Sequence, residues 1–269
     1  MCKVSIIMGI YNMESKFSIV KLAINSILNQ TYTDFEFIIC DDGSKDKTYQ
    51  MVESLVKNDS RVILIKNDKN RGLAYSLNQC LKIAKGKYIA RMDADDISIL
   101  NRLEKEVEFL DNNSEYALVG CNLELIDDNG VWGTRILPQN PTKKDCLFGP
   151  PFAHPSIMIR KDVIDKLNGY SVEKITLRAE DYDLYMRFFA LGYKGYNIQE
   201  FLFQYRENKE TYKRWSKARI NEVKLRYRGF KNLNILFPIG WIYVLKPLIT
   251  KFIPQTFLAK LRNYRNNKI

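Results

Sequence analysis

The sequence predicts an α/β fold built on a mainly parallel sheet that helices cover on both faces. Four apolar runs of strand length lie in the first third of the chain, at residues 4–8, 35–40, 62–65 and 88–92. Helical patterns separate these runs, around residues 20–28 and over 46–56 and 73–84. Strands that are apolar throughout and alternate with helices are typical of a parallel sheet, because both faces of each strand are buried.

The second half of the chain continues this domain. The expected elements are helices over residues 102–110 and 181–191, strands over 117–126, 156–159 and 201–205, a turn at 127–130 and an irregular connection over 133–151. A length of 269 residues suits one large domain with an appendage. We therefore place the main domain at residues 1–205 and a helical C-terminal extension at residues 206–269.

Cysteine usage and the N-terminus favour a cytoplasmic protein. The five cysteines are odd in number and never form a Cys-x-x-Cys pair: Cys2, Cys40, Cys80, Cys121 and Cys146. This pattern argues against a disulfide framework and a zinc site, and it fits a reducing compartment. The opening residues, MCKVSIIMGIYN, lack the long apolar stretch of a signal peptide.

Positive charge is concentrated in the C-terminal extension. Residues 205–269 contain 16 Lys and Arg against 3 Asp and Glu, a net charge of +13, whereas residues 1–204 contain 26 against 28. A near-neutral body with a strongly basic extension indicates that the extension binds an anionic surface.

The composition of the extension favours a membrane surface. Residues 211–231 are basic with interleaved aromatics, and the apolar run 233–245 is shorter than the ~20 residues that span a bilayer. We expect a peripheral position at the inner face of the cell membrane, with four aromatics in the lipid boundary: Trp241, Tyr243, Phe252 and Phe257. The alternatives are a helical unit that packs on the body and a dimer contact. Nucleic-acid binding is not expected, because the acidic strand ends described next would repel phosphates without a metal.

Polar residues follow three of the predicted strands, at the edge where parallel sheets bind ligands. The three tips are Tyr11-Asn12, Asp41-Asp42-Gly43-Ser44 and Asp93-Ala94-Asp95-Asp96. Loop and helix-capping preferences explain any single tip equally well. The convergence of all three on one edge indicates a binding cleft.

The strongest local signal is the cluster of three carboxylates within residues 93–96. Carboxylates this close repel one another unless a cation lies between them, and oxygen ligands suit Mg²⁺ or Mn²⁺. The alternative is a solvated acidic loop that caps the next helix. Neither G-x-G-x-x-G nor G-x-x-x-x-G-K-[ST] occurs. A bound phosphate would therefore depend on the metal and on a basic side chain such as Arg71, which is otherwise a surface arginine.

Two further sites carry chemistry-bearing residues. Glu180, Asp181 and Asp183 open the helix predicted at 181–191. Acidic residues in a first helical turn oppose the helix dipole, or one of these carboxylates serves as a general base. His154 is the only histidine, and it is either a metal or substrate ligand or a packed loop residue.

Six blocks along the chain resemble family 2 of the inverting glycosyltransferases, which have the GT-A fold. They are SIIMGIYN, ICDDGSKDKT, NRGLAYSLNQCL, GKYIARMDADD, FAHPSIMIRKDV and AEDYDLYMRF, and they fall within residues 3–205. Each block is moderately specific, and six in this order are highly specific. The resemblance implies a Rossmann-like nucleotide-binding domain with a central, mainly parallel sheet.

The resemblance implies roles on the nucleotide side of the site. Tyr11 and Asn12 would line the nucleotide pocket. Asp42, with Asp41 beside it, would accept a hydrogen bond from the uracil ring. Arg71 would lie against the base or the diphosphate.

The resemblance also implies the metal and acceptor residues. Asp93 and Asp95 match the family's DxD motif, with Asp95 as the direct ligand of Mn²⁺ or Mg²⁺ and Asp93 contacting the ribose or the metal. Asp181 matches the catalytic base, and His154 and Glu180 lie on the acceptor side.

These residues predict transfer of a hexose or N-acetylhexosamine from a UDP-sugar to a hydroxyl of a saccharide. The resemblance implies a lipid-linked acceptor in surface polysaccharide assembly. One alternative is a nucleotidyltransferase that makes a nucleotide-sugar, although the phosphate loop that such enzymes carry early in the chain is not found. The other is a nucleotide-sugar-binding protein without catalytic activity.

Overall fold

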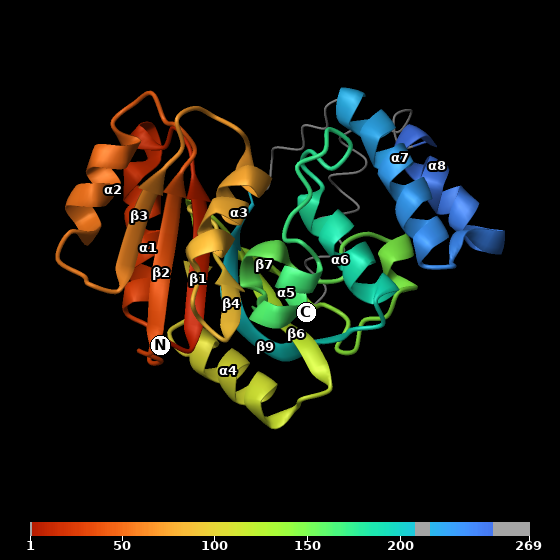
Figure 1. The fold of residues 1–269 in the computed structure, drawn as a ribbon, viewed down its shortest axis with the longest axis horizontal. Coiled ribbons are helices and arrows are strands. Elements are labelled where there is room, and N and C mark those ends of the chain that lie inside the picture. Colours follow the sequence, from red (N-terminus) through yellow and green to blue (C-terminus); the bar gives the residue numbers. More distant parts are fainter. Residues whose placement is uncertain (1, 208–215, 250–269) are drawn as a thin grey trace.

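The computed structural model describes residues 2–207 and 216–249, and nine strands within them form one sheet (Figure 1). The strands are β1 (Val4–Ile10), β2 (Phe35–Asp41), β3 (Val62–Lys66), β4 (Tyr88–Arg91), β5 (Ile97–Ser98), β6 (Tyr116–Asp127), β7 (Gly130–Arg135), β8 (Met158–Arg160) and β9 (Lys194–Arg206). They lie in the order β3-β2-β1-β4-β8-β6-β9-β5, and β7 pairs with β6.

The first four predicted strands are confirmed, and they are parallel neighbours. β1 pairs with β2 on one side and with β4 on the other, and β2 pairs with β3. Every residue of β2 is buried, and so is every residue of β1 except Gly9. Burial on both faces explains why these strands are apolar throughout.

Beyond β4 the sheet is mixed. β8 runs antiparallel to both β4 and β6, whereas β6 and β9 run parallel. The sequence predicted an irregular connection from residue 133, and this prediction is wrong for residues 133–135. They belong to β7, which forms a hairpin with β6. Only Gly133 of its sequence GVWGTR is buried, so β7 shows no buried apolar pattern that would have predicted it.

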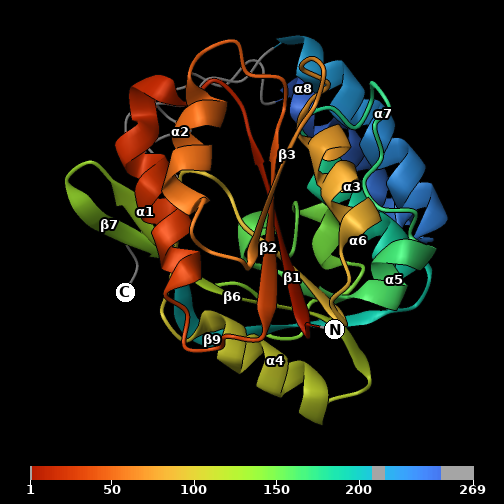
Figure 2. The same cartoon turned by 60° about the vertical axis from the view of Figure 1, so that its left-hand side comes forward.

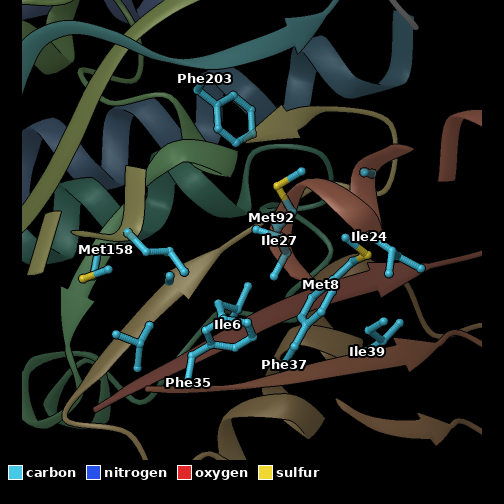
Figure 3. Close-up of a cluster of buried hydrophobic side chains, with 14 of the residues drawn as sticks. Ile6, Met8, Ile24, Ile27, Phe35, Phe37, Ile39, Met92, Met158 and Phe203 are labelled. Carbon is cyan, nitrogen blue, oxygen red and sulfur yellow. The ribbon is translucent and has the colours of Figure 1, made fainter. Parts of the chain in front are cut away.

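Helices cover both faces of the sheet (Figure 2). Their bounds are α1 (Phe17–Leu28), α2 (Thr48–Val56), α3 (Leu73–Ile83), α4 (Arg102–Asn112), α5 (Lys161–Lys166), α6 (Glu180–Ala190), α7 (Ser216–Asn232) and α8 (Trp241–Ile249), with short turns η1 (Glu14–Lys16), η2 (Asp145–Leu147), η3 (His154–Ser156) and η4 (Leu236–Gly240). One core cluster packs α1, α2 and α4 against one face, including Ile24, Ile27, Phe37 and Met92 (Figure 3). A second cluster packs α3, α5 and α6 against the other face.

The C-terminal helices α7 and α8 lie on the far side of α6 from the parallel strands (Figure 1). A third cluster of buried side chains joins Tyr182 and Met186 of α6 to Leu225 and Phe230 of α7 and Val244 of α8. Residues 216–249 therefore pack on the body as a helical unit, which is one of the alternatives that the sequence left open.

Two of the four aromatics expected in a lipid boundary lie in the described residues. Trp241 is exposed, whereas Tyr243 packs its ring 5.2 Å from that of Phe148 and is half-buried. Phe252 and Phe257 lie outside the described residues. Within residues 2–207 and 216–249, no helix combines the length and the apolarity that crossing a membrane requires.

Candidate active site

The three predicted polar tips meet at one edge of the sheet. β1 lies between β2 and β4, so the tips that follow these strands are neighbours. The Asp42 amide donates to the Ile10 carbonyl at 2.8 Å, and the Met92 amide donates to the Ile7 carbonyl at 3.1 Å. Asp42 and Asp93 therefore follow strands about 10 Å apart, which is two inter-strand spacings.

The tip of β1 is locked to the loop after β2. Asn12 adopts a left-handed conformation with φ of 48°. Its amide donates to Ser44 Oγ at 2.9 Å, and its side-chain oxygen accepts from the Lys45 amide at 3.0 Å. Tyr11, next to it, has an exposed side chain. This arrangement leaves the Tyr11 ring free of the core and beside the strand ends.

Asp42 anchors the loop that leads into α3. Its Oδ1 accepts from Asn67 Nδ2 and from the Arg71 amide, both at 2.9 Å, and its Oδ2 accepts from the Gly72 amide at 2.7 Å. The two loops touch so closely that a Cβ on Gly43, whose φ is +70°, would overlap the Lys69 backbone. The carboxylate keeps about one of its four acceptor positions for a ligand.

Asp41 and Arg71 complete the nucleotide side. Asp41 is fully buried, and its Oδ1 accepts from the Ser44 amide at 2.6 Å. Its Oδ2 has no hydrogen-bond partner among the described residues. The Arg71 guanidinium lies 4.8 Å from the centre of the Tyr75 ring and 3.3 Å from Asp68, at the surface.

Asp93, Asp95 and Asp96 can hold a metal ion. One carboxylate oxygen from each lies within 4.8 Å of the others. Burial raises the pKa of Asp95, and repulsion by Asp93 raises it further. Asp96 is buried, with Oδ1 accepting from the Arg206 amide at 2.7 Å and Oδ2 without a partner among the described residues. Crowded, partly unsatisfied hard oxygens fit Mg²⁺ or Mn²⁺.

Arg91 supplies a buried positive charge beneath this cluster. Its Nη2 lies 2.5 Å from Asp93 Oδ1. Its Nε and Nη1 are buried and have no hydrogen-bond partner in the part of the chain that the structure describes. Burial opposes the charge, but the Asp93 carboxylate outweighs it and raises the pKa of Arg91. The guanidinium therefore stays charged next to the predicted metal ligands.

A cleft of about 920 Å³ lies beside the acidic cluster. Its lining includes Arg91 and Asp93 from the β4 end, His154 from η3, and Glu180 and Asp181 from the first turn of α6. Residues 134–138 and 148–152 add a mainly apolar wall to this lining. Four predicted site residues thus face one space: Asp93 from the predicted metal site, and Asp181, Glu180 and His154 from the predicted acceptor side. Tyr11, Asn12, Asp41, Asp42 and Arg71 lie along the adjoining strand ends.

The Asp181 carboxylate has the proton affinity of a base that works near neutral pH. Burial raises its pKa to about 6, and the neighbouring Glu180 charge adds to the effect. Arg91 and the amide of Tyr182, which donates to Asp181 Oδ1 at 2.7 Å, act in the opposite direction. A carboxyl group with a pKa near the operating pH is suited to general base catalysis.

His154 is a neutral side chain that pairs with Tyr170. Its Nε2 lies 3.0 Å from the Tyr170 hydroxyl. Burial lowers the pKa of His154 well below its usual value, and the Arg91 charge lowers it further. Burial raises the pKa of Tyr170. The neutral pair can donate or accept hydrogen bonds in the cleft but carries no charge.

Arg91 and Tyr170 are site residues to which the sequence analysis assigned no role, and Asp96 entered it only as a member of the carboxylate cluster. Arg91 carried a usable signal, because a basic residue that ends an apolar strand beside three carboxylates needs a reason to be there. Asp96 belongs to the acidic cluster, but its spacing alone does not separate it from a helix cap. Tyr170 had no signal, since it enters the site through a loop between α5 and α6.

Comparisons with known proteins agree with this geometry. Residues 5–167 match the model of "Glycosyl transferase family 2". The chain belongs to glycosyl transferase family 2. It is 42% identical to "Putative glycosyltransferase EpsE" of Bacillus subtilis, over 98% of this chain and 94% of the relative.

Two further matches fit the same family. "UDP-Gal:alpha-D-GlcNAc-diphosphoundecaprenol beta-1,3-galactosyltransferase" of Escherichia coli is 29% identical over 95% of this chain and 93% of that protein. The crystal structure of S. aureus TarS 1-349 in complex with UDP-GlcNAc matches with a TM-score of 0.71 at 16% identity, covering 95% of this family 2 chain and 77% of TarS. The TarS match shows the shared GT-A fold.

Proposed function

We propose that this family 2 member transfers a hexose or N-acetylhexosamine from a UDP-sugar to a saccharide hydroxyl with inversion at the anomeric carbon. One observation carries the proposal: Asp181 and Asp93 line the same cleft, and Asp93 belongs to the carboxylate cluster. This shared lining supports a general base and a site for a charged leaving group within one cleft. Relatives whose names specify UDP-sugars support the choice of donor.

The donor would lie along the ends of β2, β1 and β4. The uracil ring would occupy the region of Tyr11, Asp41 and Asp42, and Arg71 would lie near this ring or the diphosphate. Asp93, Asp95 and Asp96 would hold Mg²⁺ or Mn²⁺. When bound, the ion would neutralise charge on the departing diphosphate as a Lewis acid.

The acceptor would enter the cleft from the side of His154 and Glu180. Asp181 removes the proton from the incoming hydroxyl as its oxygen attacks the anomeric carbon. The bond to the diphosphate breaks with its electron pair on the leaving UDP. Because attack and departure occur on opposite faces, a single displacement inverts the centre. The neutral His154–Tyr170 pair can hold acceptor hydroxyls without competing for the metal.

We propose a lipid-linked saccharide as the acceptor and the inner face of the cell membrane as the working location. The name of the Escherichia coli relative specifies a diphosphoundecaprenol acceptor. The concentration of positive charge in residues 205–269, 16 basic against 3 acidic side chains, supports contact with anionic lipid.

A donor screen tests the proposal. UDP-, GDP- and dTDP-sugars are each incubated with the protein, Mn²⁺ or Mg²⁺, and a lipid-linked saccharide, and the released nucleotide is measured. We expect metal-dependent release of UDP and a glycosylated product. Release of pyrophosphate instead would support a nucleotidyltransferase, and UDP-sugar binding without turnover would support a silent binding protein.

The variant Asp181→Asn separates binding from chemistry in the same assay. We expect it to retain UDP affinity and to lose transfer, because an amide cannot accept the hydroxyl proton. Asp162→Asn is the matched control, since Asp162 is an exposed carboxylate that pairs with Lys166 across one helical turn. Wild-type transfer by Asp181→Asn would remove Asp181 from the role of base.

A further inference from the structure

An apolar patch lies on the outside of η4 and α8. The patch consists of Tyr227, Phe237, Ile239, Trp241, Ile242 and Leu245. Phe237 is 77% exposed, Ile242 64% and Leu245 45%. We call these six side chains the outer patch. Large apolar side chains gathered this way on a folded protein mark an interaction surface.

Aromatic contacts join three members of the outer patch. The Trp241 ring lies 5.4 Å from that of Tyr227 on α7 and 6.2 Å from that of Phe237 on η4. On α8, Trp241, Ile242 and Leu245 follow helical spacing on the exposed side. Val244 is buried on the other side, against the third core cluster. Both sides of α8 are thus apolar, and only one of them has a partner among the described residues.

Turn η2 links α7 and α8 to the catalytic cleft. The Leu147 carbonyl accepts from Arg226 Nη1 at 3.1 Å, and the Cys146 carbonyl accepts from the Tyr182 hydroxyl. Phe148, directly after this turn, is 62% exposed, lines the cleft and packs its ring on Tyr243 of α8. The apolar wall of the cleft therefore leads, through Phe148, to the helix that carries the outer patch.

The composition of the segment that carries the patch favours an anionic partner. The patch belongs to residues 205–269, whose net charge is +13, while the rest of the chain has a net charge of −2. Exposed Trp, Tyr and Phe beside Lys and Arg are the composition that binds the headgroup region of anionic bilayers. A second copy of the same chain would bring two strongly positive segments together, which is unfavourable.

We propose that the outer patch docks on an anionic lipid surface next to the apolar wall of the cleft, where Phe148 packs on Tyr243 of α8. Docking through Trp241 and Ile242 would place the cleft mouth where a lipid-linked acceptor is presented. The lipid binding stands on the patch alone. The role in acceptor delivery rests on the proposed glycosyltransferase function.

Vesicle binding of the full chain tests the docking. Removal of the C-terminal helices is not suitable, because it would expose the buried cluster on α6. The double variant Ile242→Ser/Leu245→Ser is compared with Leu22→Ser, whose parent side chain is 53% exposed on α1, on the other side of the molecule (Figure 1). Each protein is sedimented with phosphatidylcholine vesicles and with vesicles that also contain phosphatidylglycerol.

We expect the wild type and Leu22→Ser to sediment with the phosphatidylglycerol vesicles and the double variant to bind at least about tenfold more weakly. Equal binding by the double variant would overturn the proposal. So would sedimentation velocity, without vesicles, that shows a dimer which the double substitution dissociates, because the patch would then be a contact between copies. Circular dichroism establishes that all three proteins are folded.

An activity measurement separates this proposal from the catalytic one. Transfer is measured to a lipid-linked acceptor in vesicles and to a short-chain, water-soluble analogue. We expect the double variant to lose transfer to the vesicle acceptor only. If the wild type transfers to neither acceptor, the proposed function fails while the vesicle sedimentation still decides the docking. An equal loss toward both acceptors would overturn the delivery role.

Discussion

The Arg91 guanidinium lies 2.5 Å from the Asp93 carboxylate, and both residues line the same cleft as Asp181. The Arg91 side chain is almost completely buried. Burial raises the pKa of Asp181 and of Glu180, and the Arg91 charge offsets part of this rise in both, in addition to its ion pair with Asp93. A single buried cation thus influences both the predicted metal ligands and the predicted base.

Loss of the Arg91 charge should move the pH dependence of transfer. The acid limb of kcat/KM should lie near pH 6 in the wild type, since Asp181 must be ionised and its pKa is about 6. In Arg91→Met the acid limb should move to higher pH by about one pH unit, because the positive charge that favours ionised Asp181 is lost. Arg91→Lys, which keeps the charge, should leave it nearly in place. A pH–rate profile of each variant measures this shift. Arg61→Met is the control, because it also removes an arginine that is paired with an aspartate, Asp59.

Removal of the Glu180 charge should have the opposite effect. Glu180 repels the ionised form of Asp181 and so raises its pKa. In Glu180→Gln the acid limb of kcat/KM should therefore move below pH 6. Opposite shifts in Arg91→Met and Glu180→Gln identify Asp181 as the titrating group, whereas shifts in the same direction would show that another group controls the limb.

Asp95→Ala should weaken metal-dependent UDP binding by at least about tenfold, because one of three clustered oxygen donors is lost. Isothermal titration with UDP in the presence of Mn²⁺ measures this change. Asp128→Ala is the control, since Asp128 lies near the site on the surface and pairs with Arg206. Unchanged UDP affinity in Asp95→Ala would exclude Asp95 from the metal site.

Asp42→Ala should destabilise the protein as well as weaken nucleotide binding. The substitution leaves the side chain of Asn67 and the amides of Arg71 and Gly72 without their acceptor. Loss of three charge-assisted hydrogen bonds should reduce the free energy of unfolding by about 2–4 kcal/mol in urea titrations. Asp68→Ala, in the same loop, removes an exposed pair with Arg71 and should leave the free energy of unfolding nearly unchanged. Equal effects of the two substitutions would show that Asp42 does not anchor the loop.

The donor half of the site was predictable because parallel strands deliver their ends to one edge. Once 4–8, 35–40 and 88–92 were recognised as buried strands, the meeting of Asn12, Asp42 and Asp93 followed from topology. The anchoring role of Asp42 did not follow, since it depends on how loop 67–72 folds back. The sequence predicted a strand at 156–159 and a helix at 181–191, but it did not specify that β8 pairs antiparallel to β4 or how α6 packs, and these determine that Asp181 shares a cleft with Asp93.

The C-terminal extension shows a different limit of sequence analysis. Residues 241–248 are apolar on both sides of a helix, so hydropathy alone cannot say which side meets the protein. The structure separates Val244, which is buried against α6 and α7, from Ile242 and Leu245, which are exposed. Basic composition indicated an anionic partner but not the packing of Tyr243 on Phe148.

Arg102 and Glu106 form a buried pair of side chains behind the site. Arg102 donates to the carbonyls of Arg91 and Pro155, both at 3.2 Å, and thereby ties the end of β4 to the turn that carries His154. Its Nε lies 3.5 Å from Glu106, which is fully buried. Neither Glu106 oxygen has a hydrogen-bond partner among the described residues. Burial raises the pKa of Glu106 to about 8, and Arg102 offsets only part of that effect.

Stability should therefore fall as pH rises, and Glu106→Gln should abolish much of the fall. The pKa of Glu106 is about 8 in the folded protein, against about 4.3 in an unfolded chain. Between these values the folded state holds a proton that the unfolded state has released, so the free energy of unfolding decreases by up to roughly 1.4 kcal/mol per pH unit. Glutamine mimics the protonated side chain and does not titrate. Urea unfolding at pH 6 and pH 8 should show a smaller loss in the free energy of unfolding for Glu106→Gln than for the wild type. Glu104→Gln is the control on the exposed side of α4, and it should lose as much as the wild type. Identical losses in all three proteins would mean that Glu106 is ionised in the folded state and that Arg102 stabilises it fully.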